Sequence, residues 1–193
     1  MLSVFNPWIS MWTEPKSTIR AIVLRNPNFG VVYLVSIYTL QNFFYVFSFF
    51  HIKFPVYLTL GVSLLLSPIL GMVWLYFFGA VFYLIGRCLK GSAPMKYILT
   101  AIAWSKIPMS ISLLMWFVLF AANQGIDLLY SLSNIEWVFI GTIASILMIW
   151  SQVLLFQSIR EIQKFSVVKT LSNMVLSWIS FNLILYFIYF LIF

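Results

Sequence analysis

Five long apolar blocks follow one another along this 193-residue chain, and only short polar connections separate them. The blocks cover residues 30–50, 56–86, 97–122, 137–157 and 167–193. Each block reaches roughly the 20 residues that an α-helix needs to cross a bilayer core of about 30 Å. The pattern predicts an all-α, polytopic membrane protein with five transmembrane helices, whose membrane domain covers residues 29–193.

The second block is too long for a single upright span. As one helix, residues 56–86 would reach about 46 Å at 1.5 Å per residue, yet they cannot hold two full spans and a turn. Pro68 interrupts the block, and Gly71 follows it. We expect a kinked or strongly tilted span, and a short interfacial piece before Pro68 is the alternative.

Residues 1–28 are too polar and too broken by proline to cross a membrane, so they form a separate segment. Asn6 and Pro7 predict a helix start, with Asn6 at the N-cap and Pro7 at the first helical position. Trp8 and Trp12 follow four residues apart, which places both indoles on one helical face.

A second helix is predicted from Pro15 onward, and its pattern is modestly amphipathic. We expect Thr13 to cap it, because threonine is a favoured N-cap residue. Lys16 and Arg20 flank its apolar side, which collects Pro15, Ile19, Ile22 and Val23. The pattern predicts a helix in the cytoplasmic membrane interface with its bases toward anionic headgroups. The alternative is a short cytoplasmic cap packed on the bundle.

Composition supports the membrane assignment. Hydrophobic residues make up 63% of the chain and charged residues 8%, whereas a soluble domain carries about 25% charged residues. The net charge is +7, but the bases lie between apolar blocks. They therefore indicate topology and contact with anionic lipid headgroups rather than nucleic acid.

The basic residues also predict the orientation of the chain. Only Lys53 lies between the first two blocks, and no base lies between the third and fourth or after the fifth. The other connections and the N-terminal segment hold Lys16, Arg20, Arg25, Arg87, Lys90, Lys96, Arg160, Lys164 and Lys169. Because bases stay on the cytoplasmic side, we expect a cytoplasmic N-terminus and a C-terminus outside.

Polar residues interrupt several of the apolar blocks, including Ser151 with Gln152 in the fourth and Ser177, Ser180 and Asn182 in the fifth. Gln41 and Asn42 lie near the middle of the first block, and Ser105 with Lys106 precedes Pro108 in the third. We expect such side chains to face the bundle interior, either as contacts between helices or as the lining of a polar groove. We expect Lys106 to snorkel to the cytoplasmic face where Pro108 breaks the block, and a buried functional charge is the alternative.

The chain lacks the parts of membrane-embedded enzymes. His51 is the only histidine and Asp127 the only aspartate, which excludes an HExxH zinc pair and a two-aspartate protease. No GxSxG motif is present, and a pairing of His51 with a serine remote in sequence is the alternative that stays open. A single cysteine, Cys88, leaves no intramolecular disulfide. We therefore expect a non-catalytic protein without a cofactor or a metal.

Two stretches, NPW…W…P..TIR.I at the start and AIAWSKIP early in the third block, resemble the Yip-domain family in its bacterial branch. The resemblance covers nearly the whole chain, and none of its positions is a catalytic signature. The most specific matching positions are Asn6, Pro7, Trp8, Pro15, Thr18, Ile19, Arg20, Ala103, Trp104, Ser105 and Pro108.

The resemblance implies membership in a group whose eukaryotic members are Ypt/Rab-interacting membrane proteins of the secretory pathway. This chain departs from them, because NPNFGVVYL stands where they carry an Asp-Leu-x-Gly-Pro stretch and AWSKIP replaces a Gly-Tyr-Ser-type sequence. Their long soluble N-terminal arm also has no counterpart here. These departures put a Rab partner in doubt and imply a bacterial inner-membrane protein.

Two classes of function follow. The leading hypothesis is a membrane organisation or trafficking-type scaffold that acts through helix and lipid contacts, with a membrane protein or a second copy as partner. The alternative is a transporter or channel-like protein that moves a lipid or a small solute through a polar groove near Lys106.

Overall fold

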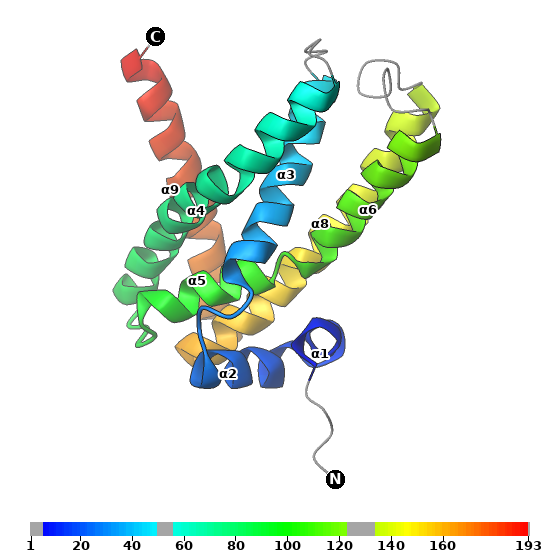
Figure 1. The fold of residues 1–193 in the computed structure, drawn as a ribbon. Coiled ribbons are helices and arrows are strands. Elements are labelled where there is room, and N and C mark those ends of the chain that lie inside the picture. Colours follow the sequence, from blue (N-terminus) through cyan, green and yellow to red (C-terminus); the bar gives the residue numbers. More distant parts are fainter. Residues whose placement is uncertain (1–5, 50–55, 123–133, 193) are drawn as a thin grey trace.

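Residues 6–49, 56–122 and 134–192 are described by the computed structural model of this chain. Their regular structure is entirely helical, which confirms the predicted all-α class for this part of the chain. His51, Lys53 and Asp127 lie outside it. The helices are α1 Pro7–Thr13, α2 Pro15–Arg25, α3 Val31–Phe49, α4 Val56–Cys88, α5 Met95–Trp104, α6 Ile107–Ala122, α8 Asn134–Gln163 and α9 Val167–Ile192 (Figure 1).

Four stretches in the described residues are long and apolar enough to cross a membrane, and a fifth is shorter. The four are Leu58–Cys88, Met95–Val118, Val138–Gln163 and Val167–Leu191, and the shorter one is Val31–Phe47. Because apolar helices of this length are the hallmark of membrane spans, the structure supports the predicted polytopic membrane protein.

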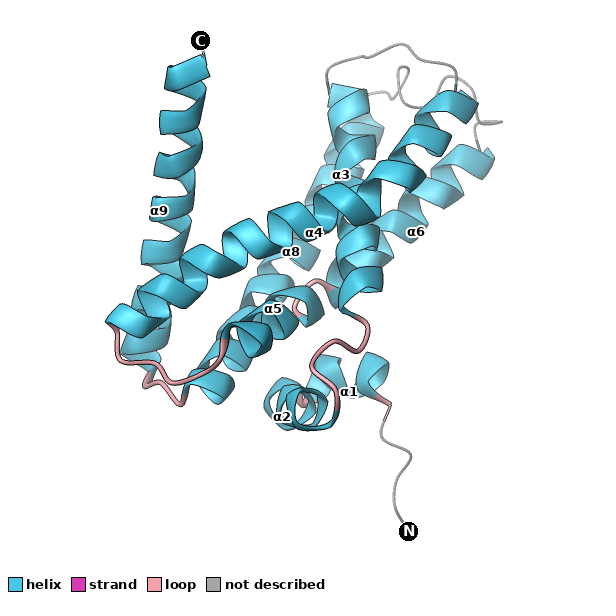
Figure 2. Ribbon diagram, turned by 60° about the vertical axis from the view of Figure 1, so that its left-hand side comes forward, coloured by secondary structure: helices cyan, strands magenta, loops and turns pink. Residues whose placement is uncertain are grey.

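Helix α4 is one continuous helix through Pro68, so the second apolar block is not split into an interfacial piece and a span. A proline inside a helix leaves the carbonyl four residues earlier without its amide partner. Here that carbonyl belongs to Leu64, and the Ser67 hydroxyl donates to it at 3.3 Å. The Ser67 hydroxyl therefore partly replaces the backbone hydrogen bond that Pro68 removes. Helix α4 crosses the bundle at a strong tilt (Figure 2).

The third apolar block, residues 97–122, is not one continuous helix, and the break lies next to Pro108, as expected. Helix α5 ends at Trp104, the chain turns at Ser105 and Lys106, and α6 begins at Ile107. Pro108 stands in the first turn of α6, where its fixed φ and missing N–H favour a helix start. Every side chain from Ile98 to Met109 is buried, so α5 lies inside the protein rather than along its surface.

The helices give the molecule a basal end, which we define by α1, α2 and α5. Helices α3, α4, α6, α8 and α9 extend away from that end (Figures 1 and 2). Helix α1 lies at the basal end, whereas the last turn of α9 lies at the opposite end (Figure 1). The chain therefore begins and ends on opposite sides of the bundle.

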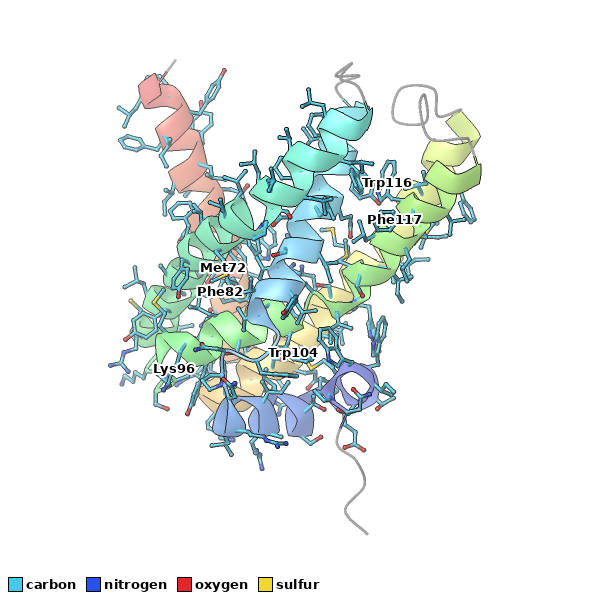
Figure 3. All side chains as sticks on the ribbon, in the orientation of Figure 1. Met72, Phe82, Lys96, Trp104, Trp116 and Phe117 are labelled. Atoms are coloured by element: carbon cyan, nitrogen blue, oxygen red, sulfur yellow. The ribbon has the colours of Figure 1, made fainter. Side chains whose placement is uncertain are left out.

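Two apolar cores hold this arrangement together. The larger core surrounds α5 and includes Ile19 of α2, Phe78 of α4 and Leu154 of α8. The smaller core joins α3, α6 and α8 through Phe44 and Trp116. Trp104 belongs to the basal core, and Trp116 lies on α6 toward the opposite end (Figure 3).

Helix α9 leaves the bundle along its length. Thr170, Asn173 and Ser177 are buried near its start, but every side chain from Asn182 to Leu191 is exposed. Figures 1 and 2 show this last part of α9 standing apart from the other helices. Because those residues are almost all apolar, this half of the helix suits contact with lipid all round.

Candidate functional site

The N-terminal segment folds as two proline-started helices, as its sequence predicts. The Asn6 side chain accepts a hydrogen bond from the Trp8 amide at 3.1 Å, and Pro7 occupies the first position of α1. Pro15 likewise begins α2, but its N-cap residue is Glu14, and Thr13 is the last residue of α1. The expected Thr13 cap is therefore wrong.

The apolar side of α2 packs against protein. Ile19, Ile22 and Val23 are buried in the basal core with α5 and α8. Arg20 lies within 2.5 Å of the Glu161 carboxylate on α8, which Lys164 also contacts. This geometry matches the alternative in which the segment caps the bundle, and it pairs Arg20 with a carboxylate rather than with a headgroup.

An aromatic joint connects the N-terminal cap to α5, and we define it as Trp8, Phe29 and Trp104. The Trp104 ring lies 5.1 Å from that of Trp8 and 5.9 Å from that of Phe29, between centroids. The buried Trp104 indole also donates a hydrogen bond to the Phe29 carbonyl at 2.8 Å. Trp12 lies at the edge of the same core.

Gly30 makes this joint possible. Its φ is +71°, in the left-handed region that favours glycine. A Cβ at this position would lie 2.9 Å from the Trp104 ring. The two halves of the family resemblance, NPW and AWS, are therefore brought together in space.

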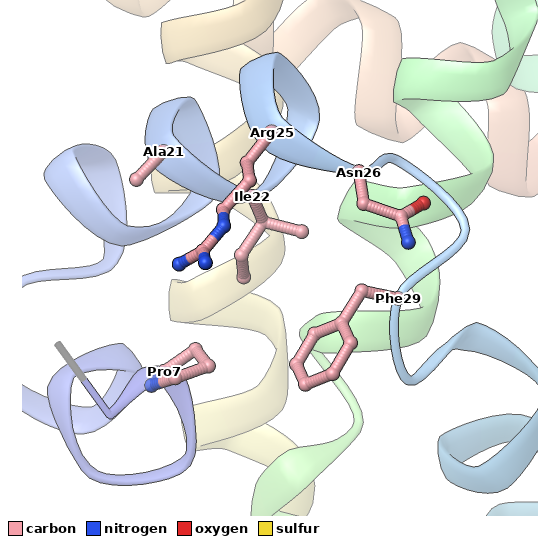
Figure 4. Close-up of a pocket in the computed structure, with 6 residues that line it drawn as sticks. All are labelled: Pro7, Ala21, Ile22, Arg25, Asn26 and Phe29. Atoms are coloured by element: carbon pink, nitrogen blue, oxygen red, sulfur yellow. The ribbon is translucent and has the colours of Figure 1, made fainter.

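A surface groove lies between α1, α2 and the turn that follows α2 (Figure 4). It has a volume of about 320 Å³ and is lined by Pro7, Ala21, Ile22, Arg25, Asn26 and Phe29. The lining combines apolar side chains with one exposed guanidinium. Such a groove can hold part of an acyl chain beside an anionic group.

Lys106 is buried, with 6% of its surface exposed. Its ammonium nitrogen lies 4.8 Å from the ring centroid of Tyr38 and 5.8 Å from that of Trp74. The expectation that Lys106 snorkels is wrong, because the break at Ser105 turns the side chain toward aromatic rings inside the bundle. The alternative prediction of a buried charge fits this position.

A cavity of about 220 Å³ adjoins Lys106 between α3, α6, α8 and α9. It brings together Lys106, Gln41 and Asn42. Ser105 and Pro108 are not part of the lining, and the Ser105 hydroxyl donates to the Ile102 carbonyl. The lining comprises Tyr38, Gln41, Asn42, Tyr45, Lys106, Met109, Ala144, Ser145, Met148, Ser151, Gln152 and Trp178.

Several polar atoms of this cavity have no hydrogen-bond partner. Gln41 is fully buried, and neither its amide nitrogen nor its carbonyl oxygen is paired. The buried Ser151 hydroxyl is also unpaired. An unsatisfied buried polar group costs about 1–3 kcal/mol, so this concentration of them inside an apolar bundle indicates a site that a ligand or water completes.

The sequence-based site omitted the aromatic residues of this cavity, although a signal was present. Tyr38, Gln41, Asn42 and Tyr45 follow the i, i+3, i+4, i+7 spacing of one helical face. Trp178 of the lining and Trp74, which contacts Lys106 outside the lining, come from other helices. No local spacing connects them to Lys106.

Positive charge gathers at the basal end of the described residues. Among the described residues, Lys106 is the one basic residue that is buried in the bundle. The nine others are Lys16, Arg20 and Arg25 in α2, Arg87, Lys90 and Lys96 around the α4–α5 turn, and Arg160, Lys164 and Lys169 around the α8–α9 turn. All three regions lie at the basal end (Figures 1 and 3).

Comparison with known proteins identifies the family. No match was found among curated proteins or among solved structures. The family model for the Yip1 domain matches residues 9–190, which include α2, Phe29 and Trp104 of the joint, and the Lys106 cavity. Because this match covers nearly the whole chain, the protein belongs to the Yip1 domain family.

Proposed function

We propose that this multi-pass membrane protein is a non-catalytic organiser of membranes, of the trafficking type, which acts through lipid and helix contacts. In this proposal it sits in a bacterial inner membrane with its basal end in the cytoplasm. Its N-terminal cap lies against anionic headgroups there.

The observation that carries the proposal is the separation of charge along the molecule. Nine bases lie at the basal end, where Glu14 and Glu161 are the only acidic side chains in the described residues. Basic residues beside a bilayer attract anionic headgroups with about 1 kcal/mol each. A cluster of this size would therefore enrich anionic lipid around the protein.

The surface of the cap supports the same function. Arg25, Leu24 and Ile9 are exposed although α2 buries its other face. Apolar and basic side chains that remain exposed together are suited to the headgroup boundary. The groove beside Arg25 would accept lipid at that depth (Figure 4).

Retention of lipid by the purified protein tests this function. The full chain is reconstituted in vesicles of phosphatidylcholine with phosphatidylglycerol, extracted in mild detergent, and analysed by native mass spectrometry for bound lipid. The combined change Lys16→Gln, Arg25→Gln and Lys169→Gln should lower the share of retained phosphatidylglycerol several-fold, whereas arginine at positions 16 and 169 should preserve it. Equal retention by both variants would contradict a role for basal charge.

Passage of a lipid or small solute is a second candidate function, and the cavity beside Lys106 favours it. In that case single cysteines at positions 41, 106 and 145, in a Cys88→Ala background, should react with a small water-soluble maleimide. Unreactive cysteines at all three positions would rule out an aqueous path, and the organising function would be unaffected.

A further inference from the structure

We propose that the cavity beside Lys106 is a binding site for the single anionic group, a carboxylate or a phosphate, of an amphiphile whose apolar chain lies along α8. The inference concerns binding alone, so it does not depend on membrane organisation at the basal end or on passage across the membrane.

The buried charge of Lys106 calls for an anion. Burying an ammonium costs several kcal/mol, and a desolvated cation–π contact returns about 2 kcal/mol. The rings of Tyr38 and Trp74 therefore offset only part of the cost. Among the described side chains, the two ion pairs both belong to Glu161 at the basal end, and none reaches Lys106.

The unpaired groups around Lys106 suit an oxyanion. The Gln41 amide nitrogen and the Ser151 hydroxyl are donors without acceptors, and both line the cavity. With the ammonium they form a set of three donor groups from α3, the α5–α6 turn and α8. An oxyanion placed among them would accept charge-assisted hydrogen bonds, which are stronger than neutral ones. The Gln41 carbonyl oxygen needs a donor of its own, such as a water or a phosphate hydroxyl.

The mouth of the cavity indicates that the rest of the ligand is apolar. The two lining residues that are exposed at the protein surface are Ser145 and Met148, and both lie near the middle of α8. They belong to the span-length stretch Val138–Gln163, so the opening faces hydrocarbon. Their exposed neighbours Ile146 and Ile149 continue an apolar surface past the opening.

The size of the cavity fits a headgroup and not a whole amphiphile. Pockets that enclose a drug-sized ligand measure about 300–1,000 Å³, and this one measures about 220 Å³. It can enclose an oxyanion with the first few carbons and a water. A free inorganic anion would fit by volume but would have to cross hydrocarbon to enter.

Direct binding to the full-length protein in phosphatidylcholine nanodiscs tests the inference. The probes are radiolabelled hexadecanoate, hexadecyl phosphate, hexadecanol and inorganic phosphate. We expect hexadecanoate or hexadecyl phosphate to bind at least tenfold more tightly than hexadecanol, and the tighter of the two identifies the anionic group. Equal binding of hexadecanol, or tight binding of inorganic phosphate without a chain, would overturn the proposal.

Substitutions then assign the binding to this cavity. Lys106→Met should weaken binding of the charged amphiphile at least tenfold, whereas Lys169→Met removes the same charge from the exposed basal end and should leave binding unchanged. Ser145→Trp narrows the mouth while keeping Lys106, so it should also abolish binding. This variant provides the test if Lys106→Met does not fold. Wild-type affinity in Ser145→Trp would show that the ligand lies elsewhere and would refute the site.

The same variants separate this inference from the function proposed above. Neutralising Lys16, Arg25 and Lys169 should change phosphatidylglycerol retention and leave hexadecanoate binding intact. Lys106→Met should weaken hexadecanoate binding and leave phosphatidylglycerol retention unchanged. If the charge at the basal end controls both measurements, the cavity is a hydrated structural site and the inference fails.

Discussion

At the scale of single residues, Trp104 connects the N-terminal cap to the membrane helices. Its ring is fully buried among Trp8, Phe29 and Gly30, and its indole N–H donates to the Phe29 carbonyl. One side chain thus provides both apolar packing and a hydrogen bond. The aromatic face of Trp104 contributes buried apolar surface, and its indole N–H fixes the position of the turn before α3.

Two substitutions separate these contributions. Trp104→Phe keeps most of the ring but leaves the carbonyl unpaired, so it should lower the free energy of unfolding by about 1 kcal/mol. Trp104→Ala also opens a cavity and should cost about 3–5 kcal/mol. Thermal unfolding in detergent measures both, with Trp150→Phe, on the exposed side of α8, as the control. Equal effects of Trp104→Phe and Trp104→Ala would contradict the packing role.

At the scale of helices, α3 and α4 cross closely at Gly71. A Cβ there would lie 2.7 Å from the Thr39 hydroxyl and 3.1 Å from the Val35 carbonyl oxygen. Gly61 lies on the same helix with nothing within 4 Å of its Cβ position. The pair therefore offers one glycine that the crossing requires and one that it does not.

Alanine at these two positions should act in opposite directions. Gly61→Ala should stabilise α4 by up to about 1 kcal/mol, since alanine is the better helix former. Gly71→Ala should destabilise the protein, because Val35 and Thr39 are β-branched and cannot easily turn aside. Chemical unfolding of the two variants under identical conditions measures the difference. A gain in stability for Gly71→Ala would show that the helices separate without cost.

The contact between α2 and α8 depends in part on the Arg20–Glu161 ion pair. The Arg20 side chain is 60% exposed, so the pair should contribute less than about 1 kcal/mol. Arg20→Glu should accelerate tryptic cleavage within the cap, and Arg20→Glu combined with Glu161→Arg should restore protection. Lys16→Glu makes the same charge change at an exposed site, and an equal acceleration there would exclude a specific pair.

These elements also show what a sequence can reveal. The Asn6-Pro7 start, the Pro15 start and four of the five apolar blocks rest on local patterns, and each matches a helix or a helix end in the structure, whereas the third block is divided between α5 and α6. The buried position of the Lys106 side chain depends on contacts with Tyr38 and Trp74, which come from two other helices. No local rule brings those rings to a lysine, and a buried charge is costly enough that snorkelling is the natural expectation.

Only part of the cavity beside Lys106 could be predicted from the sequence. Gln41 and Asn42 stand out as polar residues in an apolar block, so their inward position could be predicted, whereas the inward position of Lys106 was only the alternative. Ser105 stood out for the same reason, yet its hydroxyl donates to the Ile102 carbonyl in the last turn of α5. Whether a polar residue pairs locally or lines a cavity depends on helix packing, which hydropathy does not encode.

At the scale of the whole molecule, the two ends of the described chain lie on opposite sides of the bundle (Figure 1). Cys88 is the only cysteine in the sequence and is exposed at the basal end, at the last residue of α4. Leu191 is exposed in the last turn of α9 at the opposite end. One native and one introduced thiol therefore report the two faces of the membrane.

Labelling with a membrane-impermeant maleimide turns this into a test of orientation. In sealed inverted vesicles Cys88 should react, because the proposed orientation places the basic residues around it in the cytoplasm. In right-side-out vesicles Cys88 should stay unlabelled, and a cysteine introduced by Leu191→Cys in a Cys88→Ala background should react. Cys88→Ala alone gives the background signal. Labelling of both thiols from one side would exclude an odd number of spans, and reversed sides would show that basal charge does not set the topology.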